Sequence, residues 1–241
     1  MKRSILLFSL VIFFSSLSTS FAENKFVKSA KADLDGDGKA DRIALSGLTP
    51  HGDFHLKVNA ATIDGKFTIE AADGFIVIDL DKKDKYKEIA VHTPGPSDDH
   101  EYIIYSYDGK SIQKMEHLHG ASEFLGNGIV YVKQWMGFWA KNNKYVFEQK
   151  AKKLYEVPQE FYAVGVEATV KESFPIYKTR EYKEVIAYLK PETKMTLLVC
   201  DPSPETHNAS WSYLLKSSSG LIGWAKENQF SQKVQGLPLA D

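Results

Sequence analysis

Apolar and polar residues alternate, or apolar residues cluster, in short runs along the chain, and this pattern predicts strands. Residues 42–45, Arg-Ile-Ala-Leu, alternate polar with apolar side chains and include a β-branched residue. Similar runs occupy residues 129–132, 145–147, 162–170, 184–189, 195–200, 212–215 and 222–225. Asp64-Gly65-Lys66 and Asp108-Gly109-Lys110 predict hairpin turns between strands. We therefore expect a mainly β protein.

Two stretches of the chain align without gaps at a separation of 46 residues, a spacing typical of one propeller blade. They are residues 33–45 and 79–91. A third, fainter unit starts at the turn 125–128, with Asn142-Asn143 predicted as a further turn. A closed propeller usually has about four to eight blades. Residues 23–160 are thus predicted to form a partial propeller-like region with edges that another domain, the chain ends or a second molecule must cover.

Four carboxylates crowd into residues 33–41, Asp-Leu-Asp-Gly-Asp-Gly-Lys-Ala-Asp. Two such charges about 5 Å apart repel by roughly 3 kcal/mol at an effective dielectric constant near 20. A hard cation relieves this repulsion, and calcium prefers six to eight oxygen ligands. We predict a calcium site formed by the side chains of Asp33, Asp35, Asp37 and Asp41 and the backbone carbonyl of Lys39.

The sequence after this loop distinguishes it from an EF-hand. An EF-hand needs an acidic residue at its twelfth position, which is Ala44 here, and a strand rather than a helix is predicted to follow. The pattern Asp-x-Asp-x-Asp-Gly-x-x-Asp before an apolar strand resembles the FG-GAP, or VCBS, repeats of integrin-type β-propellers. That resemblance implies a calcium ion that stabilises a blade, with no reaction at the metal.

The second loop departs from this pattern. In the gapless alignment, Lys83 takes the place of Asp37 and Lys87 takes the place of Asp41. Because two ammonium groups can balance Asp79 and Asp81, we expect the second loop to have the same shape without calcium, or with much weaker affinity.

The last third of the chain starts a new set of strands after the polar cluster around Pro158. Four segments, Phe174-Pro175-Ile176-Tyr177, Leu189-Lys190-Pro191, Trp211-Ser212-Tyr213 and Gly220-Leu221-Ile222-Gly223-Trp224, resemble bacterial Src-homology-3-like domains. The resemblance covers residues 161–230, before a tail at 231–241. It departs from the family at Glu192, where a glycine is usual, and this disfavours a type II turn. It implies a small β-barrel that binds cell-wall peptides or protein partners, or acts as a spacer.

Within this barrel we expect Tyr177, Trp211 and Tyr213 to contact a ligand and Trp224 to pack in the core. The lone Cys200 lies in an apolar run and is expected to be a buried thiol.

The N-terminus has a basic start, an apolar run and a small-residue end at Ala22, the three zones of a signal peptide. We therefore predict an exported, secreted or periplasmic protein with no membrane span after cleavage at residue 22. Without Lys2 and Arg3, 28 basic residues face 31 acidic ones, a net charge of −3. This charge gives no support to nucleic-acid binding.

Candidates for enzymatic chemistry are few. Glu116-His117-Leu118-His119 places two imidazoles on one face of a strand, but two ligands do not make a metal site. Residues 98–101, Asp-Asp-His-Glu, fit either a solvated turn or a functional loop, which would be a binding rim or a second metal site. Trp135, Phe138 and Trp139 fit either core positions or a sugar-stacking platform.

Taken together, these patterns predict an exported, non-catalytic binding or scaffold protein of the cell envelope, stabilised by calcium, that binds a cell-wall peptide or an envelope protein and can form oligomers. One alternative is a metal-assisted hydrolase that uses His117, His119 and the loop at Asp98. Another is a purely structural envelope protein.

Overall fold

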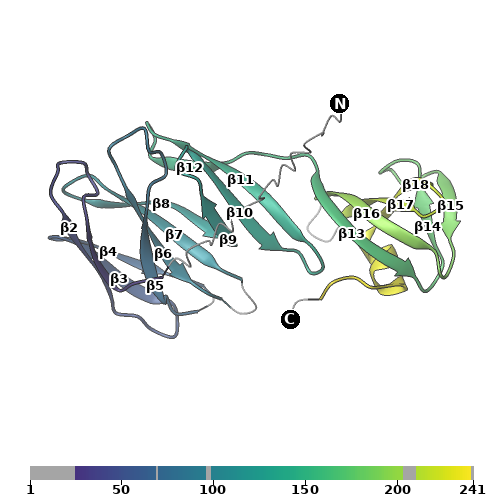
Figure 1. Ribbon diagram of the computed structural model, residues 1–241. Coiled ribbons are helices and arrows are strands. Elements are labelled where there is room, and N and C mark those ends of the chain that lie inside the picture. The colour runs from purple at the N-terminus through teal and green to yellow at the C-terminus, as the bar shows by residue number, and fades with distance from the viewer. Residues whose placement is uncertain (1–24, 69, 96–98, 203–209, 240–241) are drawn as a thin grey trace, which may run out of the picture.

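A computed structural model describes residues 25–68, 70–95, 99–202 and 210–239. The predicted signal peptide, residues 1–22, lies outside this part of the chain. The described residues are almost entirely strands and turns, which confirms the mainly β expectation (Figure 1). Their helical segments are the short α1 (Glu227–Phe230) and η2 (Ser231–Lys233).

The first twelve strands form three antiparallel sheets, each built from four consecutive strands. The first sheet contains β1 (Ser29–Ala32), β2 (Asp41–Ser46), β3 (Asp53–Val58) and β4 (Ala61–Lys66). The second contains β5 (Gly74–Ile78), β6 (Glu88–Thr93), β7 (Glu101–Tyr107) and β8 (Ile112–His119). The third contains β9 (Ala121–Phe124), β10 (Ile129–Trp135), β11 (Ala140–Glu148) and β12 (Lys153–Glu156).

The second sheet packs between the other two. One apolar core, which includes Phe54 and Tyr105, joins the first and second sheets, and another, which includes Ile104 and Val130, joins the second and third. Every residue of β6 and β7 is buried, whereas buried and exposed residues alternate in β2. The central strands have apolar residues on both faces because both faces of their sheet are covered.

The same backbone hydrogen bond links successive units. The carbonyl of Leu34 accepts from the N–H of Lys87 at 3.0 Å, and the carbonyl of Leu80 accepts from the N–H of Gly128 at 2.7 Å. The loop before the second strand of each unit therefore rests on the corresponding loop of the next unit.

Two predicted turns are wrong. Asp64-Gly65-Lys66 is the end of β4, and the turn lies at residues 59–60, where Asn59 adopts a left-handed conformation with φ 53°. Gly65 is needed for packing instead, because a Cβ there would lie 2.1 Å from the ring of Phe54. Asn142-Asn143 lies within β11, since the β10–β11 turn is formed by residues 136–139.

The C-terminal strands form one seven-stranded antiparallel sheet in the order β15-β14-β18-β17-β16-β13-β19. Their bounds are β13 (Tyr162–Val170), β14 (Phe174–Tyr177), β15 (Val185–Leu189), β16 (Lys194–Asp201), β17 (Ser212–Ser217), β18 (Ile222–Lys226) and β19 (Val234–Gln235). In the described residues, β15 and β19 are its two edges, so the sheet is not the closed barrel that we expected. The predicted tail contributes β19, which pairs with β13.

A turn in this sheet differs from expectation. The N–H of Thr193 donates to the carbonyl of Lys190 at 3.1 Å, and Glu192 between them has φ 66°. A type II turn requires this left-handed value at its third residue. Glu192 thus adopts the left-handed conformation that favours glycine, which we expected a glutamate to disfavour.

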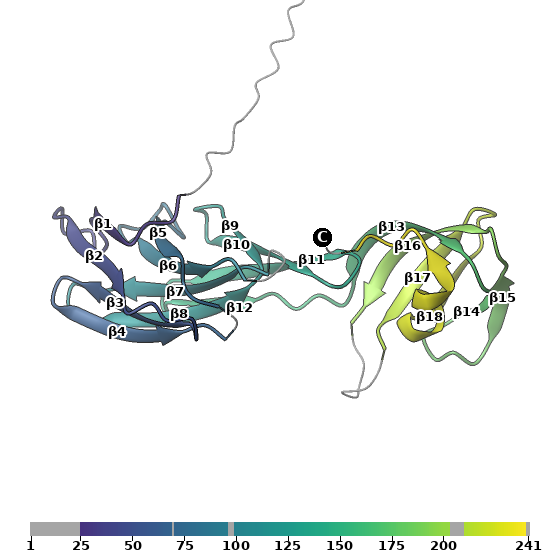
Figure 2. The ribbon, with the colours of Figure 1, turned by 90° about the horizontal axis from the view of Figure 1, so that it is seen from below.

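The tip of the β10–β11 hairpin links the three N-terminal sheets to the C-terminal sheet (Figure 2). Phe138 and Trp139 belong to the C-terminal core, and Trp139 Nε1 donates to the hydroxyl of Tyr213 at 3.1 Å. Both aromatic residues are therefore core residues, whereas Trp135 is 36% exposed.

Candidate calcium site and ligand surface

The acidic loop lies between β1 and β2, and three of its carboxylates converge. Asp33, Asp35 and Asp37 each place an oxygen within 4.8 Å of the other two. The three residues are half-buried or exposed, so a cation from solvent can reach them.

Backbone hydrogen bonds hold the acidic side chains in place. Asp33 accepts from the N–H of Gly36 at 2.8 Å and from that of Gly38 at 3.0 Å, and Asp37 accepts from the N–H of Lys39 at 2.8 Å. Gly36 and Gly38 have φ values of 70° and 86°, which favour glycine. The loop is curled by its own carboxylates, and the oxygens stay close together.

Of the other two expected ligands, the side chain of Asp41 is placed differently, and the backbone carbonyl of Lys39 stays a prediction. Asp41 is buried and lies outside this group, because its oxygens accept from the N–H of Leu34 at 2.9 Å and from Asn59 Nδ2 at 2.7 Å. The side chain of Lys39 is exposed, with its ammonium 3.7 Å from Asp37. The structure therefore brings together three of the four predicted carboxylates and uses the fourth to fix the loop to the sheet.

The donor set fits calcium. Three carboxylates supply hard oxygen ligands, and water can complete the coordination shell at an exposed loop. Gly109 of the neighbouring unit has no side chain, and this leaves space for the carboxylate of Asp35. A Cβ at Gly109 would lie only 2.6 Å from Asp35 Oδ2. Asp35 thus lies against the β7–β8 turn, which limits how far its carboxylate can move.

The second loop has an extra residue that the gapless alignment missed. Glu88, the first residue of β6, accepts from the N–H of Leu80 at 3.0 Å, just as Asp41, the first residue of β2, accepts from Leu34. Glu88 rather than Lys87 is therefore the counterpart of Asp41. The assignment of Lys87 to that position is wrong by one residue.

The acids of the second loop are dispersed. Asp84 accepts from the N–H of Tyr86 at 2.8 Å and from Gln149 Nε2 at 3.1 Å, and Asp81 accepts from the N–H of Lys83 at 3.1 Å. Burial, together with the charges of Asp84 and Asp79, raises the pKa of Glu88 to about 7. Among the described residues, the acids of this loop do not form a group like that of Asp33, Asp35 and Asp37.

The three expected ligand contacts of the C-terminal sheet occupy different environments. Tyr177 and Trp211 are half-buried, but Tyr213 is fully buried and belongs to the core. Tyr213 is therefore not available to a ligand, because its ring packs against Phe138 and Phe230. Cys200 is buried as expected, and burial raises the pKa of its thiol to about 12.

Trp224 is half-buried rather than part of the core, and it lies in a surface of aromatic and cationic side chains. The guanidinium of Arg180 lies 5.1 Å from the ring centre of Phe161 and 5.7 Å from that of Trp224. Trp224 pairs with Tyr177 across β14 and β18. We call this the aromatic–cation surface; it consists of Phe161, Tyr177, Arg180, Tyr182, Trp224 and Lys226.

Acidic residues orient Arg180. Its guanidinium hydrogen-bonds to the buried Asp201 and lies 3.5 Å from Glu160. The side chain remains 43% exposed. Sequence reasoning missed Arg180, Phe161 and Tyr182, because no pattern along the chain shows that residues from β14, β18 and two loops meet.

Comparison of the chain with protein-family models, with curated proteins and with solved structures gives no match. The described residues include no helix long and apolar enough to cross a membrane.

Proposed function

We propose that this protein is an exported, non-catalytic binding module of the cell envelope, in which calcium stabilises the first sheet and the aromatic–cation surface binds a peptide. The observation that carries the proposal is the stacking of Arg180 over Phe161 and Trp224 on an exposed face. Aromatic residues and arginine dominate the binding energy of protein interfaces.

The chemistry of this surface favours a peptide with carboxylates, such as a cell-wall peptide. The guanidinium of Arg180 has five N–H donors and remains 43% exposed beside Asp201 and Glu160, so it can also donate to a ligand carboxylate. The half-buried ring of Tyr177 gives apolar contact. Lys226, 4.8 Å from the ring centre of Tyr182, adds a second positive charge. The resemblance to Src-homology-3-like domains and to FG-GAP repeats agrees with this proposal.

Calcium has a structural role in the proposal. The ion binds the folded cluster of Asp33, Asp35 and Asp37 far better than the unfolded chain, so it raises stability by mass action.

Binding to isolated cell wall tests the proposal. Purified protein from residue 23 onward is sedimented with cell-wall sacculi in calcium, and the bound fraction is measured. The full length is needed because Phe138 and Trp139 complete the C-terminal core. We expect Arg180→Ala and Tyr177→Ala to weaken binding about tenfold, the usual loss for a central contact.

Tyr188→Ala is the matched control, because Tyr188 is 62% exposed on β15 of the same sheet and lies outside the aromatic–cation surface. Its binding should equal that of the unchanged protein. Equal binding by all variants would place the ligand site elsewhere. No binding by any of them, with calcium stabilisation intact, would favour an envelope-protein ligand or a purely structural role.

A further inference from the structure

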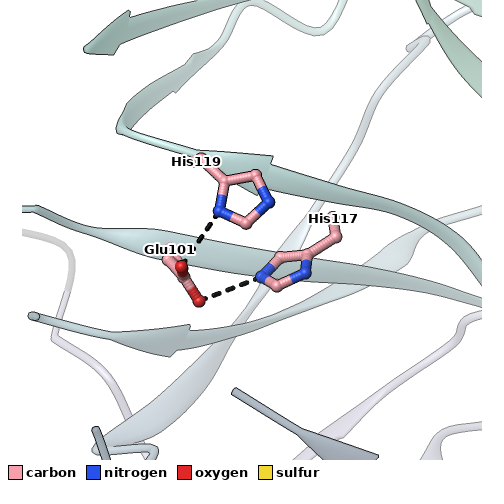
Figure 3. Close-up of side chains that lie close together, drawn as sticks. All are labelled: Glu101, His117 and His119. Atoms are coloured by element: carbon pink, nitrogen blue, oxygen red, sulfur yellow. Dashed lines mark hydrogen bonds and ion pairs between the residues drawn. The ribbon is translucent and has the colours of Figure 1, made fainter. Parts of the chain in front are cut away.

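Glu101, His117 and His119 lie together at one end of the β7–β8 hairpin (Figure 3). Residue 119 pairs with residue 101 across the two antiparallel strands, and residue 117 pairs with residue 103. Because side chains alternate along a strand, both imidazoles point to the face that carries the carboxylate of Glu101. The prediction that residues 116–119 form a strand with both imidazoles on one face is confirmed.

The three side chains are in direct contact. Glu101 Oε2 lies 3.0 Å from His117 Nε2, and Glu101 Oε1 lies 2.9 Å from His119 Nδ1. The two ring centres are 4.1 Å apart. One ligand atom from each residue lies within 4.8 Å of the others, close enough for a single ion to bind all three.

Burial is graded across the cluster. The exposed fraction of the side chain is 6% for Glu101, 16% for His117 and 54% for His119. A buried carboxylate is costly unless it is paired, and here both partners are imidazoles.

We propose that Glu101, His117 and His119 form a zinc site, separate from the calcium loop. Two imidazole nitrogens and one carboxylate oxygen are a common ligand set for zinc. Calcium prefers six to eight oxygens, so the two sites select different ions. On binding, zinc takes the place of the N–H hydrogens that face Glu101, and each neutral ring carries its proton on its other nitrogen instead.

Three protein ligands leave one tetrahedral position for water or another small ligand. A cleft of about 280 Å³ adjoins the cluster and is lined by Glu101 and His119 together with His100, Gln134 and Trp135. The open position would therefore be reached from this cleft, on the side of the more exposed His119.

A hydrogen-bonded relay from Asp73 through His92 to His100 reaches the same cleft. Asp73 Oδ1 lies 2.8 Å from His92 Nδ1, and His92 Nε2 lies 2.8 Å from His100 Nδ1. His92 is 1% exposed and stacks on Phe26 with ring centres 3.8 Å apart. This relay fixes the wall of the cleft next to Glu101.

The carboxylate of this site comes from the acidic residues 98–101, for which the sequence offered a binding rim or a second metal site as one interpretation. The hydrolase alternative combined His117 and His119 with the loop at Asp98, which lies outside the described residues. Glu101, the last residue of that acidic stretch, supplies the carboxylate. The zinc site stands on these contacts whether or not the C-terminal surface binds a peptide.

Zinc titration tests the proposal directly. Metal-free, untagged protein from residue 23 onward competes with a chromophoric zinc chelator in excess calcium, which occupies the acidic loop. We expect one equivalent of zinc to bind. Glu101→Gln and His119→Ala should each weaken zinc binding more than about tenfold while the calcium-dependent rise in melting temperature persists.

His55→Ala is the matched control, because His55 pairs with a single carboxylate, Asp64, and both side chains are exposed. Its zinc affinity should be unchanged. Absence of zinc binding by the unchanged protein, or equal affinity in His119→Ala, would overturn the proposal. His119 is largely exposed, so its alanine variant decides the matter even if Glu101→Gln fails to fold.

Discussion

The loops at residues 33–41 and 79–88 hold the same number of acids but distribute their charge differently. Each contains four carboxylates, but the first has one lysine and the second has four, which gives net charges of −3 and 0. Both use a buried carboxylate, Asp41 or Glu88, to accept from the N–H of a buried leucine. The shared hydrogen bond therefore anchors both loops in the same way, and we propose that metal binding depends on the remaining acids.

Neighbouring units reinforce this difference. In the first loop, Asp33, Asp35 and Asp37 converge, and Asp35 lies against Gly109 of the next unit. In the second, Gln149 of the third unit binds Asp84. Asp79 Oδ1 is buried and has no hydrogen-bond partner among the described residues. The comparison suggests that calcium binding needs acids that the loop's own backbone and its neighbours hold together.

The largest expected effect is a difference in the free energy of unfolding between variants of the two buried carboxylates, Asp41 and Glu88. Asp41→Ala removes an acceptor from both Leu34 and Asn59 and should cost about 4 kcal/mol, because two hydrogen bonds to a charged group are lost. Glu88→Gln keeps an acceptor for the N–H of Leu80 and removes a poorly solvated charge. We therefore expect its stability to change little at pH 7 and to increase above pH 7. Urea unfolding measures both. Equal losses would show that the two loops do not differ in this way.

The pH dependence of stability is the next largest effect. The pKa of Glu88 is raised from 4.5 to about 7 in the folded chain, so the folded state binds this proton more tightly than the unfolded state. Its contribution to stability is fully present below pH 4.5 and is lost as the pH rises to about 7, by up to about 3 kcal/mol. Urea unfolding from pH 4.5 to 8 should show this slope in the unchanged protein and a flatter profile in Glu88→Gln. The same slope in both would assign it to other groups.

A smaller effect tests the contact between units. Gly109→Ala and Gly128→Ala both place alanine at a left-handed position, φ 89° and 82°, at a cost of about 1 kcal/mol each. At Gly109 the new Cβ also meets Asp35, whereas at Gly128 it meets no atom within 4 Å. We expect Gly109→Ala to reduce the rise in melting temperature that calcium produces and Gly128→Ala to leave that rise unchanged. A calcium response that is identical in the two variants would contradict the role of the β7–β8 turn.

Several strands could be predicted from the local sequence pattern, and the bounds of β13 are those that the pattern predicted. Turns were harder to predict from the residue types that favour them. Gly65 suggests a turn but is there to make room for Phe54 on the neighbouring strand, and Asn59 provides the left-handed residue instead. Such contacts between strands do not appear in a local reading of the chain.

The candidate sites show the same limit. The acidic loop is contiguous, so its carboxylates could be recognised from spacing alone. Glu101 lies 16 residues before His117, and only the register of the β7–β8 hairpin brings them together. The extra residue before Glu88 likewise becomes clear only through the hydrogen bond to Leu80.

Calorimetric titration of calcium into metal-free protein tests the central claim most directly, because it counts the sites. The account predicts one equivalent for the unchanged protein, none for Asp35→Ala and one for Asp81→Ala. The same titration repeated with Glu101→Gln should still give one equivalent, since the zinc site is separate. Two equivalents in the unchanged protein, or loss of calcium binding in Asp81→Ala as well as in Asp35→Ala, would contradict the account.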